Sequence, residues 1–470
     1  MSPVAETDFV PWRDLLRRAH LAPLALVCFG IWLHAADEMI VATTLPALVA
    51  DIGGARWLAW NLALYEIGSI ITGVTSARLA IRFGLRRPMT VAALLFATGC
   101  AVGAAAPDMA TFLVGRLLQG LGGGGLVALA FVAVGILFPP RLMARAMATM
   151  SMLWGVSACL GPLVGGLFVE YVHWRAAWVA FAVQALLLAV LFAIGPVRGR
   201  ARGEADGGGA PVLRLSVLAL AILLVALAGS GLSLAVTIGC ATAGLAALWL
   251  FRGLDAKAGT GRLLPRSPVG FGSPVGAAML MVFAMSAATI GITVFGPVLM
   301  VALHGASPLA TGYVVAAGAI SWAVMAVLVS GAPAVDDGRN VAIGVVLIVL
   351  ATVLFVPAML HGPLWLVGIA AGLQGAGFGI AWTFIVRLSR SLTDADDAER
   401  VAGAIPTMQR VGYAVGAALL GIAANATGIA ARMDAGTAAG IALAVFGLSV
   451  VPALLGLAAT WRFVRARQRR

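Results

Sequence analysis

Fourteen runs of apolar residues dominate the sequence and limit what it can fold into. Crossing the hydrocarbon core of a bilayer takes about 20 apolar residues in a helix. Hydrophobic residues make up 61% of the 470 residues and charged residues only 11%, whereas soluble domains are about 45–50% apolar and about 25% charged. The sequence therefore predicts an all-α membrane protein with about fourteen transmembrane helices. We expect them at 21–46, 57–80, 88–106, 110–138, 143–169, 175–196, 215–231, 233–251, 275–303, 308–332, 340–360, 363–387, 401–427 and 436–461.

The stretch 215–251 is the part of this pattern that leaves an alternative open. It is one apolar run divided only at Gly229-Ser230-Gly231, and if it does not form two spans the number of spans falls to twelve. Polar connections flank it on both sides and have the composition of flexible linkers. The chain thus divides into a six-helix bundle at 1–196, a linker region with two extra helices at 197–274, and a second six-helix bundle at 275–470.

The basic residues predict the topology. With both termini inside, 26 of the 31 Lys and Arg residues fall on the inner side, while Arg56, Arg175 and Arg432 fall outside and Arg116 and Arg410 lie within spans. Such a bias places both termini in the cytoplasm and requires an even number of crossings. We therefore expect a multi-pass protein of the cell (inner) membrane. The net charge of +12 reflects this topology, so nucleic acid is not an expected partner.

The polar segments of the chain are too short, and lack the motifs, for several functional classes. No polar stretch reaches the ~50 residues of a small domain, so a soluble catalytic domain is not expected. The glycine-rich run at 120–125 lies inside a span and cannot be a phosphate-binding loop. We expect no enzyme activity and no metal site. The four cysteines each fall in a different apolar run without C-x-x-C spacing, which argues against disulfides and zinc: Cys28, Cys100, Cys159 and Cys240.

A few charged residues lie within the predicted spans, where each costs several kcal/mol unless it faces a cavity or a partner. Asp37 lies about 24 Å from the inner boundary of the first span, and Arg116 about 9 Å below the outer boundary of the fourth, so both share one level of a ~30 Å core. We expect them to meet in a water-accessible chamber. The alternative is a static ion pair that holds the two spans together.

The residues around this pair are the candidates for proton coupling. Asp37 is the first candidate for the carboxyl that carries the proton, with Arg116 as the fixed charge that poises it. Glu38 is adjacent, and His34 precedes the two acids by three and four residues, which puts it on the same helical face. Alternatively, His34 is a packed histidine that bonds to the backbone or to a neighbouring helix.

Candidates for substrate binding are spread over both halves of the chain. Glu66 lies in the outer half of its span and can bind a cationic substrate, carry a proton or only form a hydrogen bond. Trp154 and Trp382 lie deep in their spans, where they face either substrate or the core. Arg410 is expected to line the cavity from the second half.

Three segments in order resemble the drug:proton antiporters of the major facilitator superfamily, in the branch with fourteen helices. They are ADEMIVATTLPALVADIGG at 36–54, RLLQGLGGGG at 116–125 and GVSACLGPLVGG at 155–166, with weaker similarity in QGAGFG at 374–379 and QRVGYAVG at 409–416. The resemblance implies two bundles of six helices, two extra helices between them, and a site at the bundle interface.

The resemblance also implies residues that serve conformational change. Gly161 and Pro162, with Gly165 and Gly166, match its antiporter element; proline and glycine favour bending and close helix approach, and the alternative is packing without motion. The loop ARLAIRFGLRR at 77–87 keeps the family's Arg82, Gly84, Arg86 and Arg87, but Ala77 and Ile81 replace a glycine and an acid. We expect its gating latch to be weaker or built differently. The counterpart near Asp336, Asp337, Gly338 and Arg339 is degenerate.

Together these features predict a proton-coupled antiporter that exports small lipophilic compounds, cations among them, and so confers antibiotic resistance by multidrug efflux. Its partners would be the small-molecule substrate, protons and membrane lipid, with the proton gradient as energy source and no cofactor. Alternatives are a dedicated exporter of one metabolite and a proton symporter for uptake. A transport-inactive scaffold or sensor is disfavoured because buried charges would then be kept without a task.

Overall fold

The computed structural model describes residues 12–15, 17–197, 199, 212–231, 233–259, 262, 264, 269–329, 332–393, 395–429 and 434–465, and across these residues the regular structure is helical, without strands. The first half contains α1 (Trp12–Leu15), α2 (Arg18–Ile52), α3 (Leu58–Phe83), α4 (Arg86–Ala105), α5 (Met109–Leu137), α6 (Pro140–Tyr171) and α7 (Trp174–Ile194). Two helices follow, α8 (Val212–Ala228) and α9 (Leu234–Ala256). The second half contains α10 (Pro274–Thr289), α11 (Gly291–Val294), α12 (Gly296–His304), α13 (Pro308–Val329), α14 (Asp337–Leu360), α15 (Leu364–Ser391), α16 (Ala395–Ala426) and α17 (Ala435–Arg465).

Eleven of the described helices are long and apolar enough to cross a membrane, with α10 and α11 counted as one. Three more segments complete the set: α8 is apolar but has 17 residues, and α3 and α16 are long but include acidic and basic residues. The described chain thus contains the fourteen predicted segments, which confirms the fold class. The stretch 215–251 forms two helices, α8 and α9, separated at Gly229, Ser230 and Gly231. Much of the predicted linker before α8, residues 200–211, lies outside the described residues, as does Arg432.

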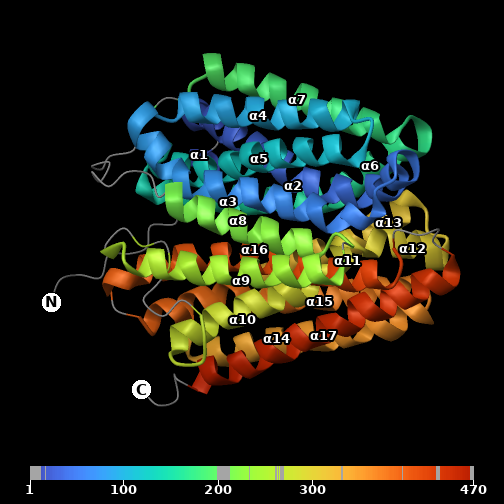
Figure 1. The fold of residues 1–470 in the computed structure, drawn as a ribbon. Helices are drawn as coiled ribbons and strands as arrows, with labels where there is room; N and C mark the ends of the chain where they lie inside the picture. The colour runs from blue at the N-terminus through green and yellow to red at the C-terminus, as the bar shows by residue number, and fades with distance from the viewer. Residues whose placement is uncertain are drawn as a thin grey trace.

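The helices run along a common axis in two groups (Figure 1). The blue-to-green helices α2–α7 form one group and the yellow-to-red helices α10–α17 the other. Helices α8 and α9 pack on each other, and α8 contacts both α3 and α16. The inserted pair therefore lies along the junction of the two groups.

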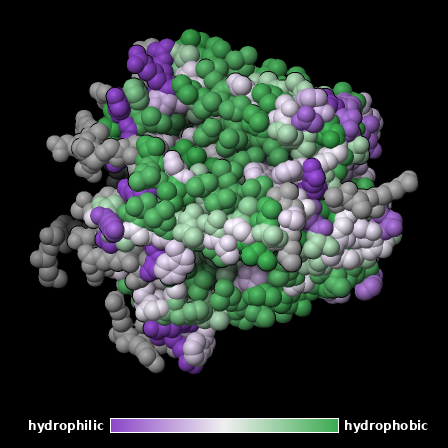
Figure 2. Space-filling view, viewed as in Figure 1, coloured by the Kyte–Doolittle hydropathy of each residue, from purple (hydrophilic) through white to green (hydrophobic). Residues whose placement is uncertain are grey.

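The surface has the banding of a membrane protein. Figure 2 shows hydrophobic side chains over the middle of the bundle and hydrophilic ones gathered at its two ends. Large apolar side chains on the outer faces of the helices are more than half exposed, among them Val183, Leu186, Val327 and Leu328. A wide apolar belt of this kind is expected to face lipid tails.

Glycines let α5 approach its neighbours closely. A Cβ added at Gly120 would lie 2.1 Å from the carbonyl oxygen of Tyr65 on α3, and one at Gly122 would lie 2.4 Å from the amide nitrogen of Phe96 on α4. Such direct backbone contact is available only to very small residues. Asp108 begins α5 by accepting the N–H of Thr111 at 2.8 Å, and this hydrogen bond lowers the pKa of the Asp108 carboxyl. The tight packing of α5 places Arg116 and Tyr65 at the same level of the bundle.

Candidate functional site

An ion pair between α2 and α5 forms the centre of the candidate site. Arg116 Nη1 donates to Asp37 Oδ2 at 2.8 Å, and the side chains of the two residues are only 3% and 2% exposed. Arg116 also donates to Gln119 Oε1 at 2.8 Å, and its guanidinium lies 4.4 Å from the ring centre of Tyr65. The structure thus brings together the two residues that the depth calculation placed at one level, and it surrounds the guanidinium with partners.

The expected water-accessible chamber does not reach this pair, which is almost fully buried. Glu38 is the accessible acid instead, with 33% of its side chain exposed. Every other residue in 33–45 is buried, so this part of α2 is covered on all sides. The exposure of Glu38 therefore opens to the interior between helices and not to lipid.

Charged groups from both halves surround Glu38. Asp37, Arg116, Glu66 and Arg410 all interact electrostatically with it. In the described part of the chain, however, no Lys or Arg nitrogen lies within 4.0 Å of its carboxylate, and the nearest basic atom is His34 Nε2 at 3.8 Å from Oε1. Glu38 is consequently a carboxylate without a direct guanidinium partner.

His34 is both a packed residue and a member of this cluster. Its side chain is fully buried, and Trp154 contacts it edge-on with ring centroids 5.5 Å apart. The Tyr65 hydroxyl lies 2.6 Å from His34 Nδ1. A neutral imidazole with its proton on Nε2 accepts from Tyr65 and points that proton toward Glu38. Tyr65 was not among the residues predicted from the sequence, although its position beside Glu66 was the available signal.

A second ion pair joins the two halves of the chain. Arg410 Nη1 on α16 donates to Glu66 Oε2 at 2.8 Å and to Ser69 Oγ at 2.9 Å, both on α3. Glu66 is 4% exposed and Arg410 24%. Both residues were selected from the sequence as separate candidates for substrate binding; their pairing and the part of Ser69 were not predicted.

The two tryptophans selected for substrate binding have different surroundings. Trp154 is half-buried beside His34 and therefore adjoins the charged cluster. Trp382 is half-buried in an aromatic group of the second half, where it lies 5.8 Å from Trp322, which stacks on Phe378 at 5.0 Å. Of the two, only Trp154 touches one of the proton-coupling candidates.

The glycine-proline segment of α6 packs against α2 and α13. A Cβ at Gly161 would lie 2.5 Å from Met39 Cβ, and one at Gly165 would lie 2.1 Å from Thr43 Oγ1. At Gly166 the contact is with Leu309 of α13, 3.0 Å from Cδ1. Pro162 lies within α6, which continues as a helix to Tyr171. This segment is therefore a close contact between the two halves.

The predicted latch loop contains a sharp turn at Gly84, whose φ of +73° is in the left-handed region. The next residue, Leu85, donates its N–H to the carbonyl oxygen of Gly199 at 2.9 Å. Arg82 and Arg87 are exposed and Arg86 is half-buried. The loop is thus tied to the segment that follows α7.

Its degenerate counterpart in the second half contains an ion pair that sequence reasoning missed. Arg387 donates to both carboxylate oxygens of Asp337 and to the carbonyl oxygen of Ala332 at 3.1 Å. Asp337 is 4% exposed. Asp337 is the first residue of α14, and Arg387 lies near the end of the neighbouring helix α15. Their placement near the ends of predicted spans was the signal available in the sequence.

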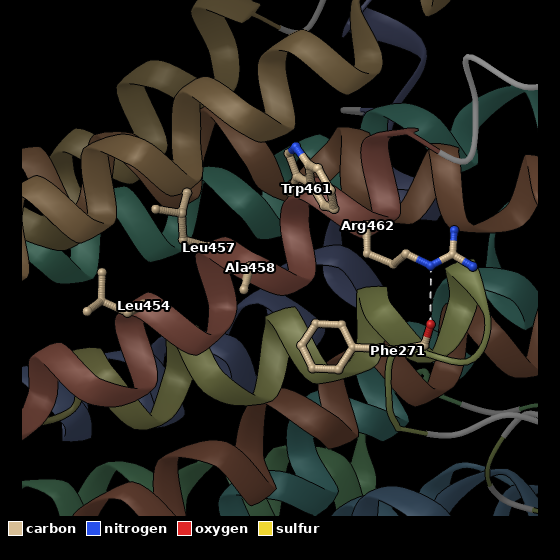
Figure 3. A pocket seen from close by; sticks show the side chains of 6 residues that line it. All are labelled: Phe271, Leu454, Leu457, Ala458, Trp461 and Arg462. Carbon is tan, nitrogen blue, oxygen red and sulfur yellow. Dashed lines mark hydrogen bonds between the residues drawn. The ribbon is translucent and has the colours of Figure 1, made fainter.

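A surface pocket is lined by other residues than the charged cluster around Glu38. It has a volume of about 480 Å³ and is lined by Phe271, Leu454, Leu457, Ala458, Trp461 and Arg462, mostly on α17 (Figure 3). Arg462 Nε donates to the carbonyl oxygen of Phe271 at 3.2 Å across one side of it. No residue selected from the sequence lines this pocket. Across the described residues, no group of three or more His, Cys, Asp or Glu side chains is placed to hold a metal ion.

Comparisons with known proteins agree with this fold. The family model described as Major Facilitator Superfamily matches residues 27–417. The chain is 32% identical over 434 residues to a protein of Mycobacterium tuberculosis named as a probable multidrug-efflux transporter, an alignment that covers 88% of this chain and 89% of that protein. It is 30% identical over 195 residues to multidrug resistance protein 3 of Bacillus subtilis, covering 41% and 38% of the two chains.

Solved structures of transporters share the architecture at low sequence identity. A bacterial homologue of the lysosomal transporter Spinster superposes with a TM-score of 0.67 at 14% identity, covering 96% of this chain and 98% of that one. A D-xylose–proton symporter superposes with a TM-score of 0.62 at 16% identity, covering 93% and 97%. These likenesses concern the fold.

Proposed function

Because the chain belongs to the major facilitator superfamily of multi-pass membrane transporters, we propose that it is a proton-coupled antiporter that exports small lipophilic compounds, cations among them. It is a transporter and not an enzyme. The observation that carries the proposal is the position of Glu38, an acid open to the interior of the bundle beside the buried pair of Asp37 and Arg116. The name of the mycobacterial relative supports efflux of several drugs.

The chemistry of antiport follows from the surroundings of Glu38. A carboxylate in a low-dielectric interior is costly unless a proton neutralises it or a cation pairs with it. Proton and cationic cargo therefore compete for the same group, so that release of one accompanies binding of the other. Trp154, beside His34, provides an aromatic surface next to that acid for a lipophilic cation.

Asp37 has a different part in the proposed cycle. Arg116 holds it in a buried ion pair, and such a pair is disrupted only when a proton replaces the guanidinium or water reaches it. Asp37 is thus the second proton-binding carboxyl, used when the helices around α2 move. His34 and Tyr65, joined at 2.6 Å, connect this pair to Glu38, because Tyr65 lies against Arg116 and His34 Nε2 lies 3.8 Å from Glu38 Oε1.

Alternating access would come from rocking the helices α2–α7 against the helices α10–α17 around this cluster. The contact of Gly166 with Leu309, near the ends of α6 and α13, is one place where the halves touch closely in this conformation. We place the protein in the cell (inner) membrane with both termini in the cytoplasm, because 26 of 31 basic residues then lie inside. Its energy source would be the proton gradient, without a cofactor.

Reconstitution into proteoliposomes tests the proposal. Ethidium movement against its gradient is measured by fluorescence while a pH gradient is imposed, for the wild type, Glu38→Gln and Asp37→Asn. Neutralising the exposed Glu170 by Glu170→Gln is the matched control and should transport normally. We expect Glu38→Gln to abolish proton-driven transport and Asp37→Asn to reduce it strongly. Unchanged coupling in both variants would refute the roles assigned here.

The same assay separates the alternatives. A dedicated exporter would move one compound and ignore ethidium and other unrelated cations. A symporter would accumulate its substrate in the direction of proton flow. A transport-inactive scaffold would move no substrate in either direction, even when the reconstituted protein is folded.

A further inference from the structure

The buried charges around Glu38 do not cancel. The cluster contains three carboxylates, Asp37, Glu38 and Glu66, and two guanidiniums, Arg116 and Arg410. Each guanidinium lies at 2.8 Å from one carboxylate, Arg116 from Asp37 and Arg410 from Glu66. When all three acids are ionised, one negative charge is left without a guanidinium partner, and it is that of Glu38.

Arg410 lies where a cationic cargo could otherwise bind. It comes from the second half of the chain, and its Nη1 donates to both Glu66 Oε2 and Ser69 Oγ on α3. Its side chain is 24% exposed while that of Glu66 is 4% exposed, so Arg410 is the more accessible member of the pair. A cation that is to bind Glu66 has to compete with this guanidinium for the carboxylate.

We propose that Arg410 determines the charge of the cargo: by neutralising Glu66 it leaves the single carboxylate of Glu38, so that the site selects lipophilic cations with one positive charge over those with two. This inference rests on the proposed function and adds the substrate class to it.

The physical reason is the cost of unpaired charge in a low-dielectric site. A singly charged cargo neutralises Glu38 and leaves both ion pairs intact. A doubly charged cargo of the same shape either brings one uncompensated positive charge or displaces Arg410 from Glu66, which leaves a buried guanidinium without its partner. Either way its binding is penalised by the like charge of Arg410.

Ethidium and propidium test this directly because they share one aromatic ring system and carry one and two positive charges. Binding of each dye to the purified full-length protein in lipid nanodiscs is measured by fluorescence titration. For the wild type we expect ethidium to bind more tightly than propidium by about tenfold or more. For Arg410→Gln, which frees Glu66, we expect the preference to fall by about tenfold or to reverse.

Three further variants distinguish charge from structural damage. Arg410→Lys keeps the positive charge and should keep the ethidium preference. The double variant Glu66→Gln/Arg410→Gln again has one free carboxylate and should restore the preference that Arg410→Gln loses. Arg390→Gln removes an exposed positive charge from the same half of the chain and should leave the ratio unchanged.

The outcomes separate this inference from the proposed function. If ethidium is transported under a pH gradient but Arg410→Gln and the double variant show the wild-type ratio, the role of Arg410 is wrong and the antiporter stands. If the ratio changes in Arg410→Gln and is not restored in the double variant, loss of structure and not charge is the cause, and the inference is overturned. If the wild type neither binds nor transports ethidium, the proposed function itself fails.

Discussion

Asn425 Nδ2 on α16 lies 2.6 Å from the carbonyl oxygen of Gly229 in the turn between α8 and α9. The same amide group approaches the carbonyl oxygens of Arg56 at 3.2 Å and Gly421 at 3.0 Å. The neighbouring Ser230 accepts a hydrogen bond from Trp60 Nε1 on α3 at 2.7 Å. The turn of the inserted helix pair is therefore bonded to both halves of the chain.

Removing this amide should loosen the turn without unfolding the bundle. Asn425→Ala leaves the carbonyl oxygen of Gly229 without its donor, and a buried unpaired acceptor costs about 1–3 kcal/mol. We expect faster hydrogen–deuterium exchange at residues 226–233, measured by mass spectrometry. Thr427→Ala is the matched control, because that hydroxyl, directly after α16, donates to carbonyl oxygens of the last turn of α16, those of Ala423 and Ala424. Equal exchange in both variants would contradict the bracing role of Asn425.

The pair of Asp37 and Arg116 should show strong energetic coupling. Asp37→Ala or Arg116→Ala leaves one buried charge without its partner, which typically costs about 3–5 kcal/mol. The double variant leaves neither charge, so its loss of stability should be clearly smaller than the sum of the two single losses. Thermal denaturation in detergent measures all four proteins. Additive losses would show that the two side chains do not interact.

Gly120 should not tolerate a side chain. A Cβ there would lie 2.1 Å from backbone oxygen of Tyr65, so Gly120→Ala has to separate α5 from α3 at the level of the candidate site. We expect a large loss of folded protein in size-exclusion chromatography and of thermal stability. Gly135→Ala, on the same helix with no atom within 4 Å of the added Cβ, is the control. It should be neutral or stabilise by up to about 1 kcal/mol through helix propensity.

Gly165 should be required for the close contact of α6 with α2, and its neighbour identifies a compensating change. Gly165→Ala places a Cβ 2.1 Å from Thr43 Oγ1, and we expect reduced ethidium transport by reconstituted protein. Thr43→Ala removes that hydroxyl and should restore part of the activity of Gly165→Ala. Gly155→Ala, whose Cβ would lie 3.8 Å from its nearest neighbour Ala323, should transport normally. If Thr43→Ala does not improve ethidium transport by the Gly165→Ala variant, the contact with Thr43 is not the reason that Gly165 is required.

The helices and the depth of their charges could be predicted from the sequence. A membrane helix satisfies its backbone hydrogen bonds within itself, so each apolar run predicted a helix independently of its neighbours, including the uncertain pair α8 and α9. Depth follows from a constant rise per residue. That is why the meeting of Asp37 with Arg116 could be foreseen, although they lie 79 residues apart.

Lateral neighbours and the direction of each side chain were decided only by the tertiary structure. Glu66 and Arg410 pair across 344 residues, because α3 of one half packs on α16 of the other, and nothing in the depth of a residue specifies which helices adjoin. Asp37 and Glu38 are consecutive, yet successive residues of a helix point about 100° apart. The packing of α5 buries the first against Arg116 and leaves the second open to the interior. The sequence by itself determined which charged groups share one level of the helices; the arrangement of helices around them decided which are paired and which single acid is left accessible.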